Sequence, residues 1–250
     1  MTKVGAEALV QILDQANALV ELRMEQTLLD ADGGQRLAQA QETFKRLRVL
    51  DMSSNPDGAR LLFRTIKEWH SLEHLVLNFN KLGQEGAQEL AAALQGSHDL
   101  KKLELTFGRI QVTGAEHIAG ALSQKMEVLN LDWNHITGTG AEAFAKSLNG
   151  SRTHLREVSL RSNHVDDDGV SALVEALKGA PNLWKFDLSD NKIAGTGARA
   201  LADAFVHLPN LTHFNIMYKD INNDSRKYMA DNWNSIYGSP YTAEFKQKGG

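Results

Sequence analysis

Residues 183–205 read LWKFDLSDNKIAGTGARALADAF, and this stretch decides the fold because the chain repeats its pattern many times. Its first residues alternate between apolar and polar, which is typical of a short strand. Asn191 follows, then a glycine-containing step at residues 195–197, and then apolar residues at helical spacing up to Phe205. One short strand and one helix cannot bury their apolar faces alone. The pattern therefore predicts a repeat protein whose copies stack on each other.

The asparagine is the clearest marker of the repeat, and it returns at steps of 25 to 29 residues. It occurs at Asn55, Asn80, Asn134, Asn163 and Asn191, with Gly108 and Lys219 in the same slot of two further units. In most units a glycine follows six residues later and a large apolar residue fourteen residues later. Including a weaker first copy over residues 19–27, the sequence predicts eight strand-bearing units.

This pattern, L-x-x-L-x-L-x-x-N-x-L followed by a helix, resembles the leucine-rich repeat family over about residues 5–236. The repeat length and the G-A-x-x-L-A-x-A-L helix resemble the ribonuclease-inhibitor-like subclass. The resemblance implies an α/β fold, a curved right-handed leucine-rich repeat solenoid with parallel strands on the concave face and helices on the convex face. It also implies that each asparagine side chain bonds the backbone of its turn. The chain departs from ribonuclease inhibitor because it contains no cysteine.

We expect a single leucine-rich repeat domain over residues 1–245. Its parts are an N-terminal cap helix over 1–18, eight repeats over 19–219, and a C-terminal helix and cap over 220–245 in which Tyr237, Tyr241 and Phe245 fold back; residues 246–250 form a disordered tail.

The beginning of the chain leaves two interpretations open. Gly5, Ala6, Leu9 and Leu13 match the helix half of a repeat, but no strand half precedes them. These residues form either a cap that shields the first core layer or part of a longer array. An imperfectly capped end would also allow a homodimer.

Composition excludes several classes of function. The net charge is −4 and the pI about 6.1, so the chain lacks the basic footprint of a nucleic-acid binder. Without cysteine it forms no disulfide and no thiolate zinc site. Acidic and amide residues interrupt the N-terminal apolar run, so it does not read as a signal peptide, and no run of ~18 apolar residues predicts a membrane span. We expect a cytoplasmic protein that binds neither nucleic acid nor membrane.

Three patterns suggest chemistry, and each has a simpler explanation. Residues 138–140 and 195–197 resemble glycine-rich phosphate loops, but similar glycines recur throughout the repeats and favour a structural turn. The acidic run at 166–168 lacks the spacing of a calcium loop and is better explained as a helix N-cap. The nine histidines form no metal-ligand pattern. We therefore predict no catalytic residue, metal or cofactor, and a protein that is not an enzyme.

A candidate binding surface lies where the strands end. Three consecutive units carry an aromatic residue just before the asparagine slot, at Phe79, Phe107 and Trp133. Aromatic side chains frequently anchor protein interfaces. The polar neighbours expected beside them on the concave face are Asn78, Thr106, Asn130 and Asp132, and Arg161 is expected as an isolated cation there, like Arg23. The rings either bind a partner or pack on each other as part of the structure.

These observations favour a non-enzymatic module that binds an unidentified protein through the concave face and the aromatic rim, because a rigid repeat surface loses little ordering entropy on binding. Two alternatives follow from the family resemblance. One is a regulator of a small GTPase, since Ran GTPase-activating proteins resemble this repeat subclass. The other is the ligand-sensing part of a larger receptor of the NOD-like type.

Overall fold

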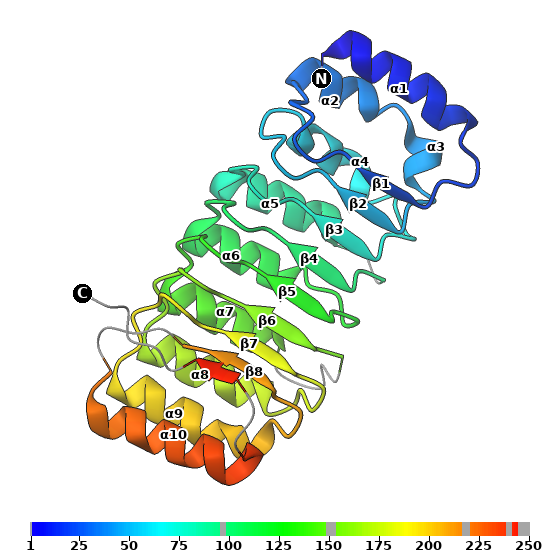
Figure 1. Ribbon diagram of the computed structural model, residues 1–250. Helices are drawn as coiled ribbons and strands as arrows, with labels where there is room; N and C mark the ends of the chain where they lie inside the picture. The colour runs from blue at the N-terminus through cyan, green and yellow to red at the C-terminus, as the bar shows by residue number, and fades with distance from the viewer. Residues whose placement is uncertain (1, 96–98, 149–153, 217–220, 239–241, 245–250) are drawn as a thin grey trace.

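The computed structural model describes residues 2–95, 99–148, 154–216, 221–238 and 242–244. Within these residues, nine short parallel strands form one sheet in the order of the sequence, and the helices lie on one side of it (Figure 1). The strands are β1 (Glu21–Arg23), β2 (Val49–Asp51), β3 (His74–Val76), β4 (Lys102–Glu104), β5 (Val128–Asn130), β6 (Glu157–Ser159), β7 (Lys185–Asp187), β8 (His213–Asn215) and β9 (Thr242–Glu244). We call the sheet face without helices the open face; it corresponds to the concave face expected from the sequence.

The helical layer is regular in its centre and irregular near the N-terminus. The helices are α1 (Lys3–Gln15), α2 (Ala31–Leu37), α3 (Gln41–Phe44), α4 (Phe63–Ile66), α5 (Gly83–Leu94), α6 (Gln111–Gly120), α7 (Thr137–Leu148), α8 (Asp167–Leu177), α9 (Gly195–Ala204) and α10 (Asn223–Tyr237), with short 3-10 helices at Ala59–Leu62 and Phe205–His207. The unit that contains Pro56 has only the first 3-10 helix and α4, in keeping with its shorter sequence.

The core lies between the two layers. The middle residue of each strand from β2 to β8 points toward the helices and is at most 1% exposed. These residues are Leu50, Leu75, Leu103, Leu129, Val158, Phe186 and Phe214. They pair in register from strand to strand, so each unit contributes one layer to a continuous core. The predicted α/β repeat architecture is confirmed.

The C-terminal end contains a strand that the sequence did not predict. β9 pairs in parallel with β8, within the segment expected to be only a helix and cap. Before it, the Tyr237 hydroxyl donates to the carbonyls of Phe205 and Leu208, at 2.8 and 2.7 Å, and Trp233 packs against Phe205 and Phe214. Lys219, Tyr241, Phe245 and the tail at 246–250 lie outside the described residues.

The acidic run at 166–168 caps a helix, as predicted. The Asp166 side chain accepts a hydrogen bond from the backbone N–H of Gly169 at 3.1 Å, at the start of α8. Asp167 accepts from the backbone N–H of Ala194 in the next unit at 2.6 Å. Both carboxylates therefore satisfy backbone donors that a helix start or a turn leaves open.

The glycines at 138–140 have a structural role, but they lie within the first turn of α7 rather than in a loop before it. A Cβ on Gly138 would come within 2.0 Å of the Asp166 carboxylate, and one on Gly169 within 2.7 Å of the Gly138 Cα. Close packing of α7 against α8 thus requires glycine here, which explains the pattern without a bound phosphate.

The repeated asparagines hold the turns that follow the strands. The Asn163 amide donates to the carbonyls of Leu131 and Arg161, at 2.8 and 3.1 Å. Its side-chain oxygen accepts from the backbone N–H groups of Asn134 and Ile136, at 2.9 and 3.3 Å. Each asparagine thereby ties its own turn to the turn of the preceding unit, and Asn55, Asn80, Asn134 and Asn163 are at most 1% exposed.

Gly108 interrupts this ladder, and the surrounding groups compensate. Its backbone N–H donates to the carbonyl of Leu105 at 3.2 Å, the same carbonyl that accepts from the Asn134 amide at 2.7 Å. A Cβ at Gly108 would lie 2.9 Å from the Asn134 side-chain oxygen. At position 108, the small residue therefore leaves room for the next asparagine, Asn134, to make these bonds.

We predict that Asn163→Ala lowers the free energy of unfolding by about 3 kcal/mol or more, because it removes the partners of several buried backbone groups that each cost ~1–3 kcal/mol when unsatisfied. Chemical denaturation monitored by circular dichroism measures this. The matched control is Asn210→Ala, which removes one exposed bond to the Pro181 carbonyl and should cost less than about 1 kcal/mol. Equal losses in the two variants would contradict a dominant role for the ladder.

Candidate functional site

The three aromatic residues predicted as a binding surface lie side by side. Phe79, Phe107 and Trp133 follow β3, β4 and β5 at the same repeat position, and we call them the aromatic stripe. The ring centroids of Phe79 and Phe107 are 5.0 Å apart with planes 19° from parallel. Those of Phe107 and Trp133 are 4.9 Å apart with planes 8° from parallel. The rings therefore do pack on each other, as one of the two interpretations expected.

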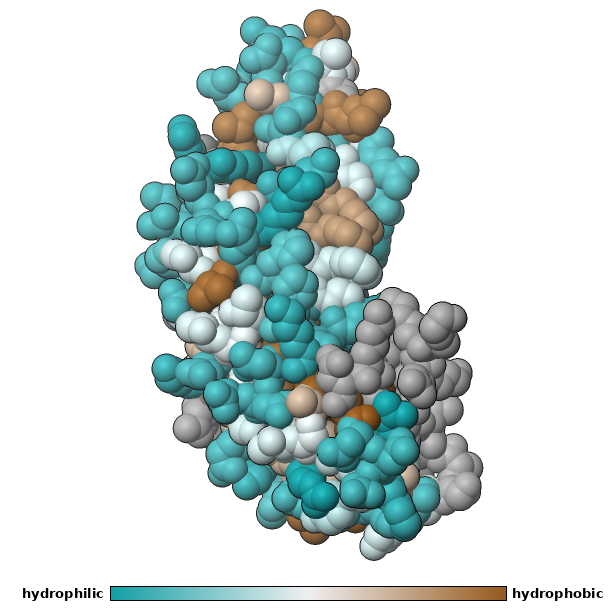
Figure 2. Space-filling view, turned by 90° about the vertical axis from the view of Figure 1, so that its left-hand side faces the viewer, coloured by the Kyte–Doolittle hydropathy of each residue, from teal (hydrophilic) through white to brown (hydrophobic). Residues whose placement is uncertain are grey.

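Packing does not bury the stripe. Phe79 remains 48% exposed, Phe107 39% and Trp133 42%, so part of each aromatic side chain reaches solvent. Much of the surface in Figure 2 is hydrophilic, with hydrophobic patches in separate places. Single exposed apolar residues are ordinary on a protein surface, whereas a contiguous group is typical of an interaction site.

The backbone beneath the stripe is left-handed. The φ angles of Phe79, Phe107 and Trp133 are 61°, 56° and 59°, and the other described residues in this slot adopt the same conformation. Those residues are Gln26, Ser54, Ser162 and Asp190. The conformation is thus imposed by the repeat, and it costs a residue with a Cβ roughly 1–2 kcal/mol. Bulky aromatic residues are unusual in this region, so three in succession require an explanation.

The four predicted polar neighbours lie on the open face beside the stripe, and hydrogen bonds connect them. Asn78 donates to the Glu104 carboxylate at 2.9 Å and accepts from the backbone N–H of Thr106 at 2.8 Å. Asn130 accepts from the Thr106 hydroxyl at 3.2 Å and from the backbone N–H of Asp132 at 3.1 Å. These side chains support the ends of the strands and present a preorganised polar border to the stripe.

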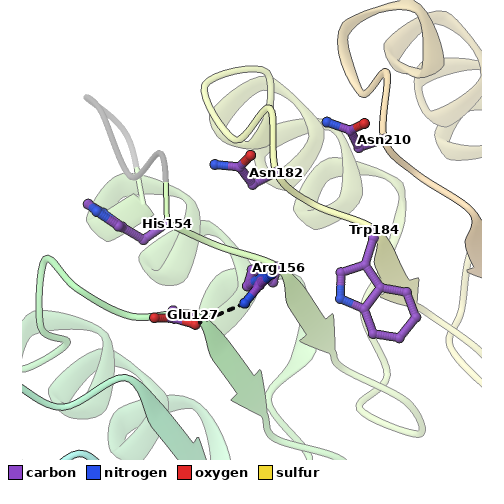
Figure 3. Close-up of a pocket in the computed structure, with 6 residues that line it drawn as sticks. All are labelled: Glu127, His154, Arg156, Asn182, Trp184 and Asn210. Carbon is purple, nitrogen blue, oxygen red and sulfur yellow. Dashed lines mark ion pairs between the residues drawn. The ribbon is translucent and has the colours of Figure 1, made fainter.

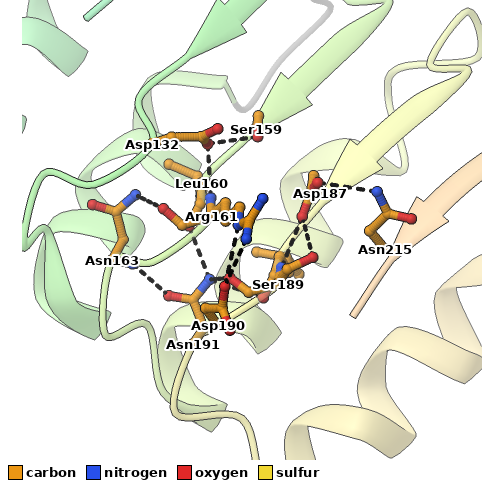
Figure 4. A network of polar contacts seen from close by, with 11 residues as sticks. Asp132, Ser159, Leu160, Arg161, Asn163, Asp187, Ser189, Asp190, Asn191 and Asn215 are labelled. Atoms are coloured by element: carbon orange, nitrogen blue, oxygen red, sulfur yellow. Dashed lines mark hydrogen bonds and ion pairs between the residues drawn. The ribbon is translucent and has the colours of Figure 1, made fainter. Parts of the chain in front are cut away.

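The Asp132 side chain is held in place by hydrogen bonds from the next repeat (Figure 4). It accepts hydrogen bonds from the Ser159 hydroxyl at 2.6 Å and from the backbone N–H of Arg161 at 2.9 Å. Burial raises the pKa of the Asp132 carboxyl above its usual value, and the nearby Asp187 carboxylate acts in the same direction. The hydrogen bonds from Ser159 and Arg161 act in the opposite direction, because they stabilise the charged carboxylate.

The expectation of isolated cations at Arg23 and Arg161 is wrong. Arg161 forms an ion pair with Asp190, with both Nε and Nη2 at 3.1 Å from the same carboxylate oxygen. Arg23 pairs with Glu21. Arg161 and Asp190 are in successive repeats, and Arg23 and Glu21 are two residues apart on one strand. The repeat pattern alone did not predict either ion pair.

A basic row lies next to the aromatic stripe, and the sequence analysis missed it. We use this name for Lys81, Arg109, His135, His164 and Lys192, which occupy the slot just after the buried asparagine or Gly108 and are all exposed. The first four also have left-handed φ angles, between 48° and 62°. His135 and His164 meet edge to face with centroids 5.2 Å apart. Burial lowers the pKa of His164, and Lys192 and His135 lower it further.

The basic row runs parallel to the stripe because each of its members is two residues beyond a stripe-slot residue, with an inward-pointing residue between them. The basic row could therefore have been found in the sequence by comparing the residues that directly follow the asparagine slot in each repeat. The stripe thus has polar and acidic groups on its open-face side and cationic groups on its other side.

A shallow pocket of about 450 Å³ lies at the opposite ends of the strands (Figure 3). It is lined by Glu127, His154, Arg156, Asn182, Trp184 and Asn210. Arg156 is already paired with Glu127 at 3.5 Å, and Trp184 packs edge to face on His213 with centroids 5.0 Å apart. The Asn210 amide also donates to the Pro181 carbonyl at 2.8 Å. Because these lining groups are engaged within the chain, the aromatic stripe is the stronger candidate.

Among the residues that the structure describes, no group of three histidine, aspartate or glutamate side chains is arranged to hold a metal ion. None of their helices is both long and apolar enough to span a membrane.

Comparisons with known proteins agree with the repeat architecture. A family model described as leucine-rich repeat matches residues 70–91, 122–145, 152–174 and 180–202. A chain from the yeast Rad7 and Elc1 complex is similar over 100% of this chain, with a TM-score of 0.71 and 16% identity, and 65% of that yeast chain is covered. The actin-binding site 2 of leiomodin-1 matches 49% of this chain and 72% of its own, with a TM-score of 0.43 and 18% identity. No curated protein sequence matches the chain.

We predict that Trp133→Gly is more stable than Trp133→Ala by about 1 kcal/mol, because glycine adopts a positive φ without the clash that alanine retains. Thermal unfolding of both variants measures the difference. Trp184 is the matched control, since it is not among the residues with a positive φ. At this position Trp184→Ala should be more stable than Trp184→Gly, because glycine loses more backbone entropy on folding and has no strain to relieve. The same order of stability at both positions would show that the backbone at Trp133 is not strained.

Proposed function

Because this chain is a leucine-rich repeat protein, we propose that it is a non-enzymatic interaction module whose open face and aromatic stripe bind another protein. The repeat fold supplies a rigid surface of the kind that protein-binding modules use, and its turns are fixed by buried hydrogen bonds before any partner arrives. Little conformational entropy is therefore lost when the surface is covered.

The observation that carries this proposal is the aromatic stripe. The fold imposes a left-handed conformation at this slot, where a small polar residue or glycine would cost least. Three successive units instead carry Phe79, Phe107 and Trp133, each about 40–50% exposed. Strained residues concentrate at functional sites, where the surrounding structure holds them in place. Stacking between the rings offsets part of this cost, ~0.5–1.5 kcal/mol per pair, but it does not explain why the ring edges remain in solvent.

The arrangement of the rings favours a protein over a nucleic acid. Phe107 has a ring stacked on each side, so neither of its faces is open to a nucleobase. Single-stranded nucleic acids bind aromatic residues through those faces. The exposed ring edges form an apolar ridge instead, and the apolar side chains of a protein segment can pack along it.

The charges around the ridge indicate the chemistry of the partner. Lys81 and Arg109 lie on one side of the stripe, beyond Asn80 and Gly108, and Glu104 and Asp132 lie on the other. A matching segment carries apolar residues that contact the ring edges and acidic residues that approach the basic row. Such charge pairing sets orientation and speeds association more than it adds affinity.

The structural relative is consistent with this role at the level of the fold. The yeast chain with a TM-score of 0.71 occurs in a complex with a second protein, Elc1. That pairing is a property of the yeast protein. For the present chain it supports only the proposal that a repeat surface of this kind associates with another protein.

We predict that a variant with Phe79→Asn, Phe107→Asn and Trp133→Asn loses its protein partner. The immobilised full chain and the variant are incubated with lysate of the source cells, and the bound proteins are quantified by mass spectrometry. Asparagine tolerates the left-handed backbone, so the fold should persist. Loss of aromatic anchors at interfaces typically costs 2 kcal/mol or more, so we expect recovery of the partner to fall at least roughly tenfold.

The control for this experiment removes apolar surface elsewhere. Val206→Asn with Ile236→Asn changes two exposed residues at the C-terminal end, which are 62% and 37% exposed. This variant should capture the same partner as wild type. Undiminished capture by the stripe variant, with both proteins melting alike, would overturn the assignment of the binding surface.

We further predict that Lys81→Gln with Arg109→Gln weakens capture of the same partner and reduces its dependence on salt, because charge pairs at the rim of an interface act mainly through screened long-range attraction. Binding is measured at low and physiological ionic strength by surface plasmon resonance, and the association rate should fall more than the dissociation rate rises. Lys67→Gln with Lys146→Gln, two exposed changes on the helical side, should leave both quantities unchanged. An unaltered salt dependence in the first variant would exclude an acidic partner segment.

A further inference from the structure

The first strand leaves one edge of the sheet open. β1 pairs with β2, and no described strand lies on its other side. The Val20 carbonyl accepts from the backbone N–H groups of Arg48 and Val49, and the Met24 N–H donates to the Asp51 carbonyl. Because backbone groups alternate in direction along a strand, those of Glu21 and Arg23 face away from β2. Such an edge is a template for another strand.

The apolar groups around this edge are incompletely covered. Leu22 is only half-buried, whereas its counterparts Leu50 and Leu75 are 1% and 0% exposed. Val20, at the entry to the strand, is 50% exposed. The end of the core is therefore capped on the helical side but remains accessible beside β1.

Helix α1 carries a second apolar surface. Ala6, Val10 and Leu13 pack inward against the first unit. Val4 and Ile12 point away from it and are 75% and 64% exposed, with the exposed Ala8 midway between them. The spacing of four residues places Val4, Ala8 and Ile12 on one side of the helix.

We propose that this end binds a second copy of the chain, with β1 of the two copies paired antiparallel about a two-fold axis at Leu22. The surface is self-complementary in that register. Glu21 of one copy lies opposite Arg23 of the other, and the reverse pair forms at the other end of the three-residue strand. Both members of each pair have outward-facing backbone groups, which is the arrangement that forms hydrogen-bonded pairs in an antiparallel sheet.

The side chains agree with the same axis. In the single chain Glu21 and Arg23 pair with each other on the open face, and both are at least 48% exposed there, so each can turn to the opposite strand. Leu22 of one copy meets Leu22 of the other on the core side. A two-fold contact is isologous, so the same residues supply both halves of the interface.

The outer stripe of α1 is also symmetric about its centre. When two copies of α1 cross in antiparallel orientation, Val4 of one copy approaches Ile12 of the other, and Ala8 lies near the axis, where a small side chain permits close approach. In this dimer the sheet of one copy continues into the sheet of the other, and the two helical layers meet through their α1 helices. Like charges opposite each other would destabilise the antiparallel pairing of the two β1 strands. In the sequence Glu21-Leu22-Arg23 each charge faces an opposite charge, so the pairing avoids this repulsion.

The test uses charge reversal in two chains. Wild type at concentrations up to about 100 μM is analysed by sedimentation equilibrium and light scattering, and we expect a dimer. Glu21→Arg places a second arginine opposite Arg23 of the other copy, and Arg23→Glu places two glutamates opposite each other. Each variant alone should dissociate at least about tenfold more readily, because like charges then face each other across the interface.

An equimolar mixture of the two variants restores opposite charges at both positions, so a heterodimer should form in the mixture. Ile12→Glu should give a monomer by a separate route, and Lys146→Glu, on a distant helix, should remain a dimer. Melting of each variant verifies that these exposed changes leave the fold intact. The stripe variant with three asparagines should also remain dimeric, because the two surfaces are separate.

Three results would overturn the proposal. These are a wild type that stays monomeric throughout the concentration range, single variants as dimeric as wild type, and a mixture that does not recover. Assemblies larger than a dimer would exclude a closed two-fold contact at this end.

Discussion

The buried hydrogen bonds of the repeated asparagines are the constraint on which the rest of this structure depends. Each strand of three residues ends in a sharp turn whose backbone groups are buried and must find partners. Asn163 supplies four such bonds to two successive turns, and the residues on either side of it, Ser162 and His164, adopt left-handed conformations. The bonds that stabilise the turn therefore also direct the residues on either side of the asparagine outward, in register with the same residues of the next unit.

This geometry explains why the candidate site has two parallel columns. The column before the asparagine contains the aromatic stripe, and the column after it contains the basic row. Ring stacking at about 5 Å is a consequence of strand spacing, because a residue at a fixed repeat position meets its counterpart one strand away. What the fold does not determine is the identity of the side chains. Left-handed slots favour small residues, so the backbone conformation alone does not account for Phe79, Phe107 and Trp133, and the proposed binding role would account for them.

Much of this could be predicted from the sequence, because a repeat makes each position visible several times. The strands, the helices and the alignment of the aromatic residues followed from the periodicity of the leucine, asparagine and glycine slots. The ion pair between Arg161 and Asp190 did not, because side-chain partners one unit apart depend on rotamers and not on spacing. β9 did not follow from the sequence because it lies in a segment without the repeat pattern. The basic row did not follow from the pattern because its members, lysine, arginine and histidine, do not share a residue type.

A stack of repeats must also solve the problem of its two ends, and the two ends of this chain differ. At the C-terminal side, Trp233 and Tyr237 of α10 cover Phe205 and Phe214, and the Tyr237 hydroxyl satisfies two carbonyls of the preceding turn. At the N-terminal side, α1 covers the helical layer but leaves Leu22 and the outward backbone of β1 accessible. Natural edge strands are usually blocked by charges that repel a second strand. Glu21 and Arg23 repel a copy in parallel register, where like charges meet, and attract one in antiparallel register. In the proposed dimer, the charge order on these three residues thus favours the antiparallel two-fold contact over a parallel one, in which like charges would meet.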